Sequence, residues 1–198
     1  MNDNTNEEEI APEAEKDEQV EKKPSLGKEI RDYIVMIAVV VAAVLVINQV
    51  FLINARIPSA SMEDTIMTND RVFGNRLAYS GDKEPERYDI IIFKFPDDPK
   101  QYFIKRVIGL PGETVEIREG KVYINNSVQP LDDSFCPEEP LGNYGPYKVP
   151  EGCYFVMGDN RNKSNDSRFW VHTFVTKQAI LGKAMFRYWP VDRMGTVG

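Results

Sequence analysis

The feature that most constrains the fold of this chain is an uncharged apolar run near its N-terminal end. Residues 33–53 read YIVMIAVVVAAVLVINQVFLI, with only Asn48 and Gln49 strongly polar. A helix of this length spans roughly 30 Å, the thickness of a bilayer's hydrocarbon core. The run is longer than the apolar part of a typical cleavable signal and follows a long acidic segment. A soluble buried helix would show a polar face. We therefore expect a permanent transmembrane anchor helix over 30–53.

The basic residues around this run predict its orientation. Four precede it and one follows it closely, namely Lys22, Lys23, Lys28 and Arg31, and then Arg56. Lys and Arg near a membrane span stay on the cytoplasmic side, and acidic residues count little. We expect a single-pass protein of the cell (cytoplasmic) membrane, with a cytoplasmic N-terminus and an extracytoplasmic domain over 54–198.

The net charge of −7 lies almost wholly before residue 54. Residues 1–53 hold 5 Lys/Arg and 11 Asp/Glu, a charge of −6, whereas residues 54–198 hold 19 and 20, a charge of −1. Residues 1–29 have almost no large apolar side chains, so we expect a disordered acidic cytoplasmic tail. The near-neutral remainder lacks the basic footprint of a nucleic-acid binder, so no nucleic acid is expected as a partner.

Residues 54–198 alternate short β-type runs with Gly, Pro and Asp turn signals, which favours an all-β domain over β-α units. Strands are predicted at 70–77, 88–95, 101–110, 113–125, 147–159 and 179–189. Glu119-Gly120 suits a hairpin turn. Four prolines and two glycines predict a surface loop over 130–147. The expected fold class is mainly β, with a single N-terminal transmembrane helix.

The cysteines and the single histidine offer little chemistry. Cys136 and Cys153 fall in the outward domain, where a disulfide is permitted and two free thiols are the alternative. Two cysteines do not make a structural zinc site, so no metal is expected. The only histidine, His172, has no second signal beside it and is expected to be structural or exposed.

A serine nucleophile without histidine needs another base, and Lys105 is the candidate. A lysine that is neutral near pH 8 requires the cation to be destabilised by roughly 3 kcal/mol, which burial among apolar neighbours supplies. Lys105 lies between Phe103-Ile104 and Val107-Ile108. Strand alternation points Lys105 and Arg106 to opposite faces, which lets one of them face inward. The alternative is an edge lysine that extends to solvent.

Two polar segments complete the candidate site. ARIPSASMEDT, at 55–65, presents two serines directly after the apolar run. MGDNRNKSNDSRFW, at 157–170, contains an Asp166/Arg168 pair suited to a charge-assisted bond, and hydroxyls that can orient a base. Each segment taken singly also fits a linker or a plain turn.

Four motifs together carry a family resemblance. PSASM, YDIIIF, KRVIGLPGE and GDNRNKSNDSR, in this order behind an anchor, resemble the conserved boxes of bacterial type I signal peptidases (leader peptidases). The resemblance runs from the anchor to about Trp189, and the chain is similar to the short single-anchor form typical of Gram-positive bacteria. It implies a β-rich Ser/Lys endopeptidase that removes N-terminal signal peptides through a serine ester, without metal or organic cofactor. The implied partners are signal peptides of preproteins, membrane lipid and Sec-type translocation machinery.

The resemblance also implies the catalytic roles. Ser61 is the nucleophile and Lys105 the general base. The Ser59 hydroxyl and the Ser61 N–H form the oxyanion hole, and Ser164 hydrogen-bonds the lysine. Three further members of the last box support the site, namely Asp159 and the ion pair Asp166/Arg168.

Small apolar substrate pockets are implied for Ala-like residues one and three places before the cut. Such pockets select by excluding bulk. The candidate walls are Ile57, Met62, Ile66, Phe103 and Ile104.

The chain departs from the family pattern at three places. Glu63-Asp64 stands where a proline is common, Asn69 where a turn glycine is common, and Val171 where glycine usually follows RFW. An acid close to Lys105 would raise its pKa and weaken the base, and we expect Asp64 to point into solvent.

Two other functions fit parts of the pattern. A self-cleaving repressor-type protease shares the Ser/Lys logic, but the anchor and the lack of a DNA-binding part argue against it. A catalytically silent paralogue would act as a secretion-associated membrane receptor or scaffold. The joint presence of Ser61, Lys105 and Ser164 argues against that function.

Overall fold

The computed structural model describes residues 26–197. The chain divides between Val41 and Ala42 into two units, and each is described by itself. The predicted tail over 1–25 lies outside the described residues.

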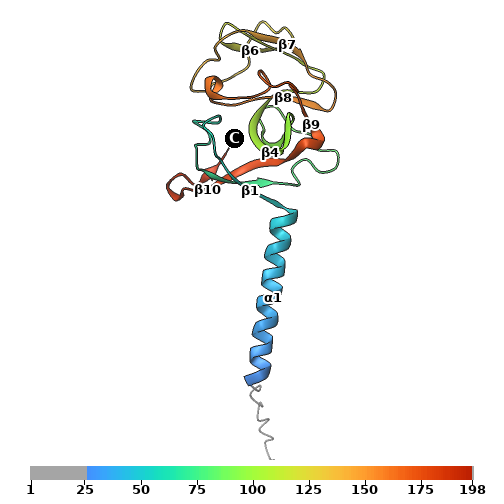
Figure 1. Ribbon diagram of the computed structural model, residues 1–198, viewed down its shortest axis with the longest axis vertical. Helices are drawn as coiled ribbons and strands as arrows, with labels where there is room; N and C mark the ends of the chain where they lie inside the picture. Colours follow the sequence, from blue (N-terminus) through green and yellow to red (C-terminus); the bar gives the residue numbers. More distant parts are fainter. Residues whose placement is uncertain (1–25, 198) are drawn as a thin grey trace, which may run out of the picture. The chain divides into compact units, whose positions relative to one another are not determined.

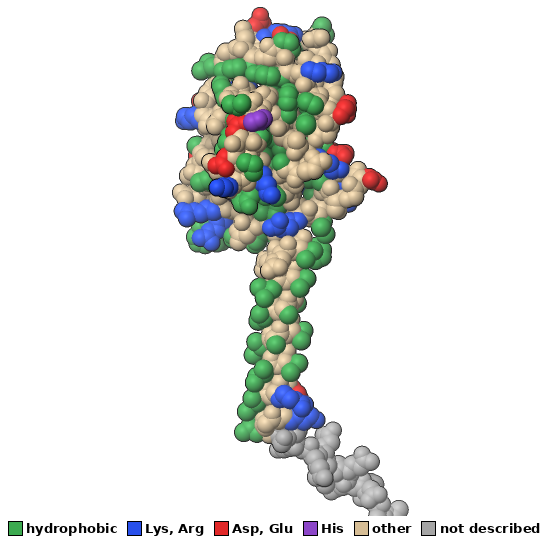
Figure 2. All heavy atoms as spheres, turned by 45° about the vertical axis from the view of Figure 1, so that its right-hand side comes forward, with side chains coloured by type: hydrophobic (Ala, Val, Ile, Leu, Met, Phe, Trp, Pro, Cys, Tyr) green, Lys and Arg blue, Asp and Glu red, His purple; other side chains and the backbone are tan. Residues whose placement is uncertain are grey.

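One long helix, α1 (Leu26–Val50), contains most of the apolar run (Figure 1). Its most apolar window has a mean hydropathy of 2.5, and hydrophobic side chains cover its surface (Figure 2). Within 26–197 it is the one helix that is long and apolar enough to cross a membrane.

The helix bounds differ from the predicted 30–53. α1 begins at Leu26, inside the segment expected to be disordered, because Lys28 and Glu29 are good helix formers. It ends at Val50 because Ile53 is buried and pairs with Gly74 in a sheet. An apolar residue suits lipid and a protein core equally well, so composition alone does not place this end.

The rest of the described chain is built of short strands and three 3₁₀ turns, which confirms the mainly β fold class (Figure 1). The strands are β1 (Leu52–Arg56), β2 (Arg71–Asn75), β3 (Ile90–Phe95), β4 (Asp98–Gly109), β5 (Thr114–Arg118), β6 (Lys121–Ile124), β7 (Tyr144–Lys148), β8 (Cys153–Met157), β9 (Val175–Thr176), β10 (Ile180–Trp189) and β11 (Gly195–Thr196). The 3₁₀ turns are η1 (Arg161–Lys163), η2 (Lys177–Ala179) and η3 (Val191–Arg193).

The strands form two antiparallel sheets. The larger has the order β1-β2-β10-β3-β4-β8-β9, with β11 added to β10, and the smaller has the order β6-β5-β7. Every predicted strand region contains a strand. The hairpin at Glu119-Gly120 is confirmed, since Arg118 pairs with Lys121 and both turn residues have positive φ (50° and 74°). β7 begins within the predicted loop 130–147, and β1, β9 and β11 were not predicted.

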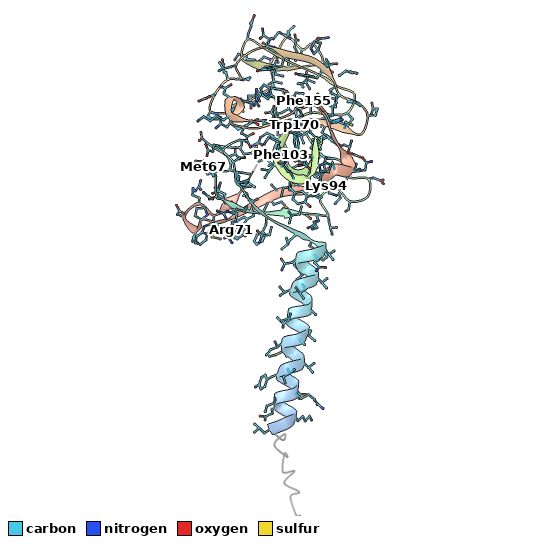
Figure 3. The ribbon with its side chains drawn as sticks, in the orientation of Figure 1. Met67, Arg71, Lys94, Phe103, Phe155 and Trp170 are labelled. Carbon is cyan, nitrogen blue, oxygen red and sulfur yellow. The ribbon has the colours of Figure 1, made fainter. Side chains whose placement is uncertain are left out.

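Three clusters of buried side chains form the core on the two sheets. One of them contains Trp170, whose ring centroid lies 5.9 Å from that of Phe103 (Figure 3). Trp170 directly follows the polar segment 157–169 in the sequence. Its burial therefore ties that segment to the strand that carries Lys105.

Asp70 anchors the loop between β1 and β2 to the C-terminal segment. Its side chain is fully buried, accepts a hydrogen bond from Met67 N (2.8 Å), and forms ion pairs with Arg193 and with Arg187 (3.5 Å). Arg187 Nη1 also donates to Thr65 O at 2.9 Å. The loop that carries the candidate nucleophile is thus held from β10 and η3.

We predict that Asp70→Ala lowers the free energy of unfolding by about 2–3 kcal/mol, because it leaves two partly buried arginines without their carboxylate. The full chain in detergent micelles would be unfolded with urea and followed by tryptophan fluorescence. The exposed control Asp82→Ala should change stability by less than about 0.5 kcal/mol. Equal effects of the two variants would contradict the anchoring role.

Candidate active site

Ser61 and Lys105 are brought together from distant parts of the chain. Ser61 lies in the turn after β1, and Lys105 lies in the central strand β4. Lys105 Nζ is 2.7 Å from Ser61 Oγ and 3.1 Å from the carbonyl oxygen of Ile104. Both side chains are buried, at 4% and 3% exposure. Ser59 Oγ lies 3.3 Å from Ser61 Oγ, so both serines of the SAS motif face the same point.

The environment of Lys105 moves its pKa toward neutrality. Burial, which penalises the charged ammonium, lowers the pKa to about 8, while the carboxylates of Asp166 and Asp159 act in the opposite direction. Asp64 is exposed, as expected, and is not among the causes of the shift. A lysine with this pKa has a substantial neutral fraction slightly above pH 7, which a general base requires.

Asp159 is held by two residues that the sequence did not indicate. Arg106 Nε and Nη2 donate to its two oxygens at 2.8 and 2.7 Å, and Thr65 Oγ1 donates to Oδ2 at 2.5 Å. Arg106 is only 4% exposed. Lys105 and Arg106 are therefore both buried, although strand alternation points them to opposite faces. β4 lies between β3 and β8, and each of its residues from Ile104 to Gly109 is buried, so both faces are covered there and a paired arginine fits. The KR dipeptide, together with the aspartates of the later polar segment 157–170, was the available signal.

Asp166 and Arg168 form the predicted ion pair. Arg168 Nε and Nη2 donate to the two carboxylate oxygens, both at 2.8 Å, and both side chains are buried. Gly158 N donates to the same carboxylate at 3.1 Å, and Arg168 Nη2 also reaches Arg161 O. The pair therefore fixes the backbone of the segment beside the dyad.

The structure does not contain the expected hydrogen bond between Ser164 and Lys105. Ser164 Oγ is buried and has no hydrogen-bond partner within residues 26–197. The lysine amine instead reaches the Ile104 carbonyl. Ser164 nonetheless lies beside the dyad, because a Cβ on Gly158 would be 2.3 Å from both Ser164 Oγ and Ser61 O. Only glycine permits this close approach at position 158.

A cavity of about 290 Å³ opens at the dyad. Its lining residues are Pro58, Ser59, Ser61, Gln101, Tyr102, Phe103, Ile104, Lys105, Lys163 and Asn165. A second cavity, of about 450 Å³, shares Pro58 and the wall Tyr102–Ile104 and continues to Ile57 on the β1 side. Of the predicted walls, Ile57, Phe103 and Ile104 therefore line these cavities.

Two predicted wall residues are core residues instead. Met62 and Ile66 are fully buried, pack in the core beneath the nucleophile loop, and line neither cavity. An apolar side chain near a nucleophile suits a pocket wall or a core, and sequence does not separate the two. Lys163 and Asn165 were missed as lining residues because irregular segments carry no periodic signal, and Tyr102, in β4, was missed as well.

The other departures from the family pattern are accommodated. Asn69 has φ 71°, a left-handed conformation that asparagine tolerates better than most residues, which explains how it replaces a turn glycine. Val171 is 87% exposed, and its N–H donates to Asp97 at 3.0 Å.

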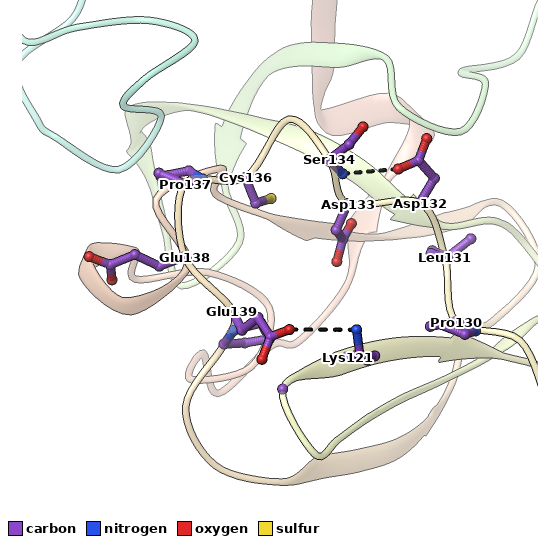
Figure 4. A pocket seen from close by; sticks show the side chains of 12 residues that line it. Lys121, Pro130, Leu131, Asp132, Asp133, Ser134, Cys136, Pro137, Glu138 and Glu139 are labelled. Atoms are coloured by element: carbon purple, nitrogen blue, oxygen red, sulfur yellow. Dashed lines mark hydrogen bonds and ion pairs between the residues drawn. The ribbon is translucent and has the colours of Figure 1, made fainter.

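The remaining candidate groups lie apart from the dyad. His172 has a 72% exposed side chain and its Nδ1 lies 2.7 Å from Asp97 Oδ1, so its prediction as an exposed residue is confirmed. Cys136 and Cys153 are free thiols. A cavity of about 410 Å³ is formed by loop 130–140 and contains neither Ser61 nor Lys105 (Figure 4).

The arrangement supports nucleophilic acyl transfer. A neutral amine 2.7 Å from a serine hydroxyl can accept its proton, and a second hydroxyl is available to stabilise an oxyanion. The cavity beside them is partly apolar and open to an extended chain.

Comparison with known proteins agrees with this chemistry. A family described as signal peptidase, peptidase S26, matches residues 30–189. "Signal peptidase I" of Leptolyngbya laminosa is 45% identical over 156 residues, covering 75% of this chain and 74% of that protein. "Probable signal peptidase I-2" of Synechocystis is 43% identical over 163 residues, covering 79% and 72%. "Signal peptidase I S" of Bacillus subtilis is 35% identical over 191 residues, covering 90% and 97%. The chain therefore belongs to the signal peptidase family, peptidase S26.

Proposed function

We propose that this chain is a membrane-bound serine endopeptidase that cleaves signal peptides from preproteins with a Ser61/Lys105 dyad. The observation that carries the proposal is the 2.7 Å contact between the buried Lys105 amine and Ser61 Oγ. A silent receptor or scaffold has no use for such a contact. Family membership supports the same reaction.

The first half of the reaction forms the ester. Neutral Lys105 takes the proton of Ser61 as Oγ attacks the carbonyl carbon of the scissile bond. The oxyanion accepts hydrogen bonds from the Ser59 hydroxyl and the Ser61 N–H. The Lys105 ammonium then gives its proton to the leaving nitrogen, the C–N bond breaks, and the signal peptide remains bound to Ser61 as an ester.

The second half returns the enzyme to its starting state. Water takes the place of the released amine, and neutral Lys105 accepts its proton as the oxygen attacks the ester carbonyl. Collapse of the second tetrahedral intermediate breaks the bond to Ser61 Oγ, which regains a proton from Lys105. The signal peptide leaves with a free carboxylate.

The edge of β4 supports binding of an extended substrate. β3 pairs with β4 from Asp98 to Arg106, whereas β8 pairs with it only from Arg106 onward. Within residues 26–197 the stretch Tyr102–Lys105 therefore has one edge without a strand partner, beside the two cavities. A substrate strand can add there, with small residues one and three places before the cut directed toward the apolar side chains of Ile57, Phe103 and Ile104.

We predict that Ser61→Ala and Lys105→Ala each abolish cleavage of a preprotein by the full chain in detergent, because one removes the nucleophile and the other the base. Ser59→Ala should retain activity but lose about 10²–10³-fold in kcat, as expected for one oxyanion donor.

His172→Ala is the matched control and should cleave at the wild-type rate, since His172 is exposed and bonded to Asp97. Product would be followed by gel shift and mass spectrometry. Full activity of Lys105→Ala would overturn the mechanism.

The pH dependence of cleavage reports the state of Lys105. We predict that kcat/KM rises with pH, with a midpoint at about 8, and levels off at higher pH, because only the neutral amine acts as the base. Asp166→Asn removes a negative charge that raises the Lys105 pKa, so the midpoint should move to lower pH.

The exposed Asp64→Asn serves as the control and should leave the midpoint in place. Rates would be measured with a fluorogenic peptide across pH 5–10, after thermal unfolding has shown that each variant is folded. A midpoint that is identical in all three proteins would assign the limb to another group.

We propose that α1 anchors the chain in the cytoplasmic membrane, with the N-terminus inside and the catalytic domain outside. Length and hydropathy support the span, and the excess of basic residues on its N-terminal side supports the orientation. A domain on the outer face would meet preproteins as Sec-type machinery delivers them, with membrane lipid around the anchor.

We predict that a Val128→Cys variant is labelled by a membrane-impermeant maleimide in intact protoplasts, since Val128 is 93% exposed. The unaltered chain is the control, because Cys136 and Cys153 are partly buried and burial raises the pKa of both thiols, that of Cys136 to about 12, which makes them less reactive than an exposed thiol. Labelling of the variant only after lysis would reverse the orientation.

A further inference from the structure

Lys163 is a basic residue of the catalytic cavity to which the reaction assigns no role. It ends the 3₁₀ turn η1, directly before the buried Ser164, and lines the same cavity as Ser61 and Lys105. None of the ten residues that line this cavity is acidic. The side chain is exposed to solvent, so a substrate can reach it.

The backbone that leads to Lys163 is held by several contacts. Arg161 has a fully buried side chain and forms a two-point ion pair with Asp133, at 2.6 and 2.8 Å. The Asn162 amide group bonds Leu141 N and Glu138, and Lys163 N donates to Asn160 O. The position of the Lys163 backbone is therefore fixed, and only the side chain loses freedom when it binds a ligand.

The charge of Lys163 has no partner within residues 26–197. Three other lysines of the domain form ion pairs, Lys183 with Asp89, Lys177 with Glu84 and Lys121 with Glu139. Lys163 forms no such ion pair in the part of the chain that is described. Its ammonium is therefore available to a carboxylate that a substrate brings in.

The two cavities indicate where that carboxylate would lie. They share Pro58 and the wall Tyr102–Ile104. The larger one extends along β1 to Ile57 and is also lined by Arg56 and Arg76, whereas Lys163 and Asn165 line only the cavity that contains the nucleophile. If the residues before the cut lie along β1 and the shared wall, as the proposed function requires, Lys163 faces the side of the leaving group.

We propose that Lys163 is a specificity-determining residue that binds an acidic side chain at the first or second position after the cut and disfavours a basic one. This inference rests on the proposed function and identifies a substrate feature of that same site. An exposed ion pair changes affinity by about two- to fivefold, and salt screens it.

The test uses three peptides with Ala one and three places before the cut. They carry Asp, Asn or Lys at the two positions that follow the cut and are otherwise identical. The full chain in detergent is expected to cleave the Asp peptide with a kcat/KM about two- to fivefold above that for the Asn peptide, and the Lys peptide more slowly. The preference should decline between 50 mM and 500 mM NaCl, because the Debye length falls.

Lys163→Gln should bring the Asp-to-Asn ratio to about one, and Lys163→Glu should favour the Lys peptide. Lys83→Gln is the matched control. It removes the same charge from an exposed turn whose cavity shares no residue with the catalytic one, and it should keep the wild-type ratio.

An Asp-to-Asn ratio that stays unchanged in Lys163→Gln, or falls equally in Lys83→Gln, would overturn the assignment to Lys163 while leaving the peptidase function in place. Failure of the wild-type chain to cleave any of the three peptides would overturn the proposed function and, with it, this inference.

Discussion

The rest of the site depends on one constraint, which is that an amine must stay buried without becoming permanently charged. Burial lowers the pKa of Lys105 and outweighs the carboxylates of Asp166 and Asp159, which raise it. Each carboxylate is held by its own arginine with two hydrogen bonds. The acids therefore brace the backbone as members of ion pairs, while burial keeps the pKa of the base depressed.

These ion pairs also help to fix the position of the nucleophile Ser61. Thr65 lies four residues after Ser61. Its hydroxyl donates a hydrogen bond to Asp159, and its carbonyl oxygen accepts one from Arg187. On the other side, Gly158 brings its segment against the Ser61 carbonyl, and Asn160 N donates to that oxygen at 3.2 Å. The loop with Ser61 has no regular structure of its own. Its geometry is therefore set by contacts from β4, β10 and the segment 158–168.

Sequence reasoning reached most strands and the lysine of the dyad because they have local signatures, whereas the role of Ser61 came from the family resemblance. Alternating β-type runs between turn residues predicted the strands except β1, β9 and β11, and a lysine among apolar neighbours predicted a buried base. It failed where one composition suits two environments. Ile53 was assigned to lipid but lies in a sheet, and Met62 was assigned to a pocket wall but lies in the core. Arg106 was missed because its burial depends on Asp159, 53 residues away. Such choices depend on tertiary contacts, which no local pattern encodes.

The same electrostatic constraint extends to the substrate. A carboxylate that enters the cleft beside the scissile bond would favour the Lys105 ammonium, as Asp159 and Asp166 do, and would weaken the base. An ammonium at Lys163 offsets that charge where it arrives, just as Arg106 and Arg168 offset the two acids of the protein. The cavity wall contains no acid of its own. A cleft that must keep one lysine neutral is thus built with its negative charges paired inside and a free positive charge at the entrance.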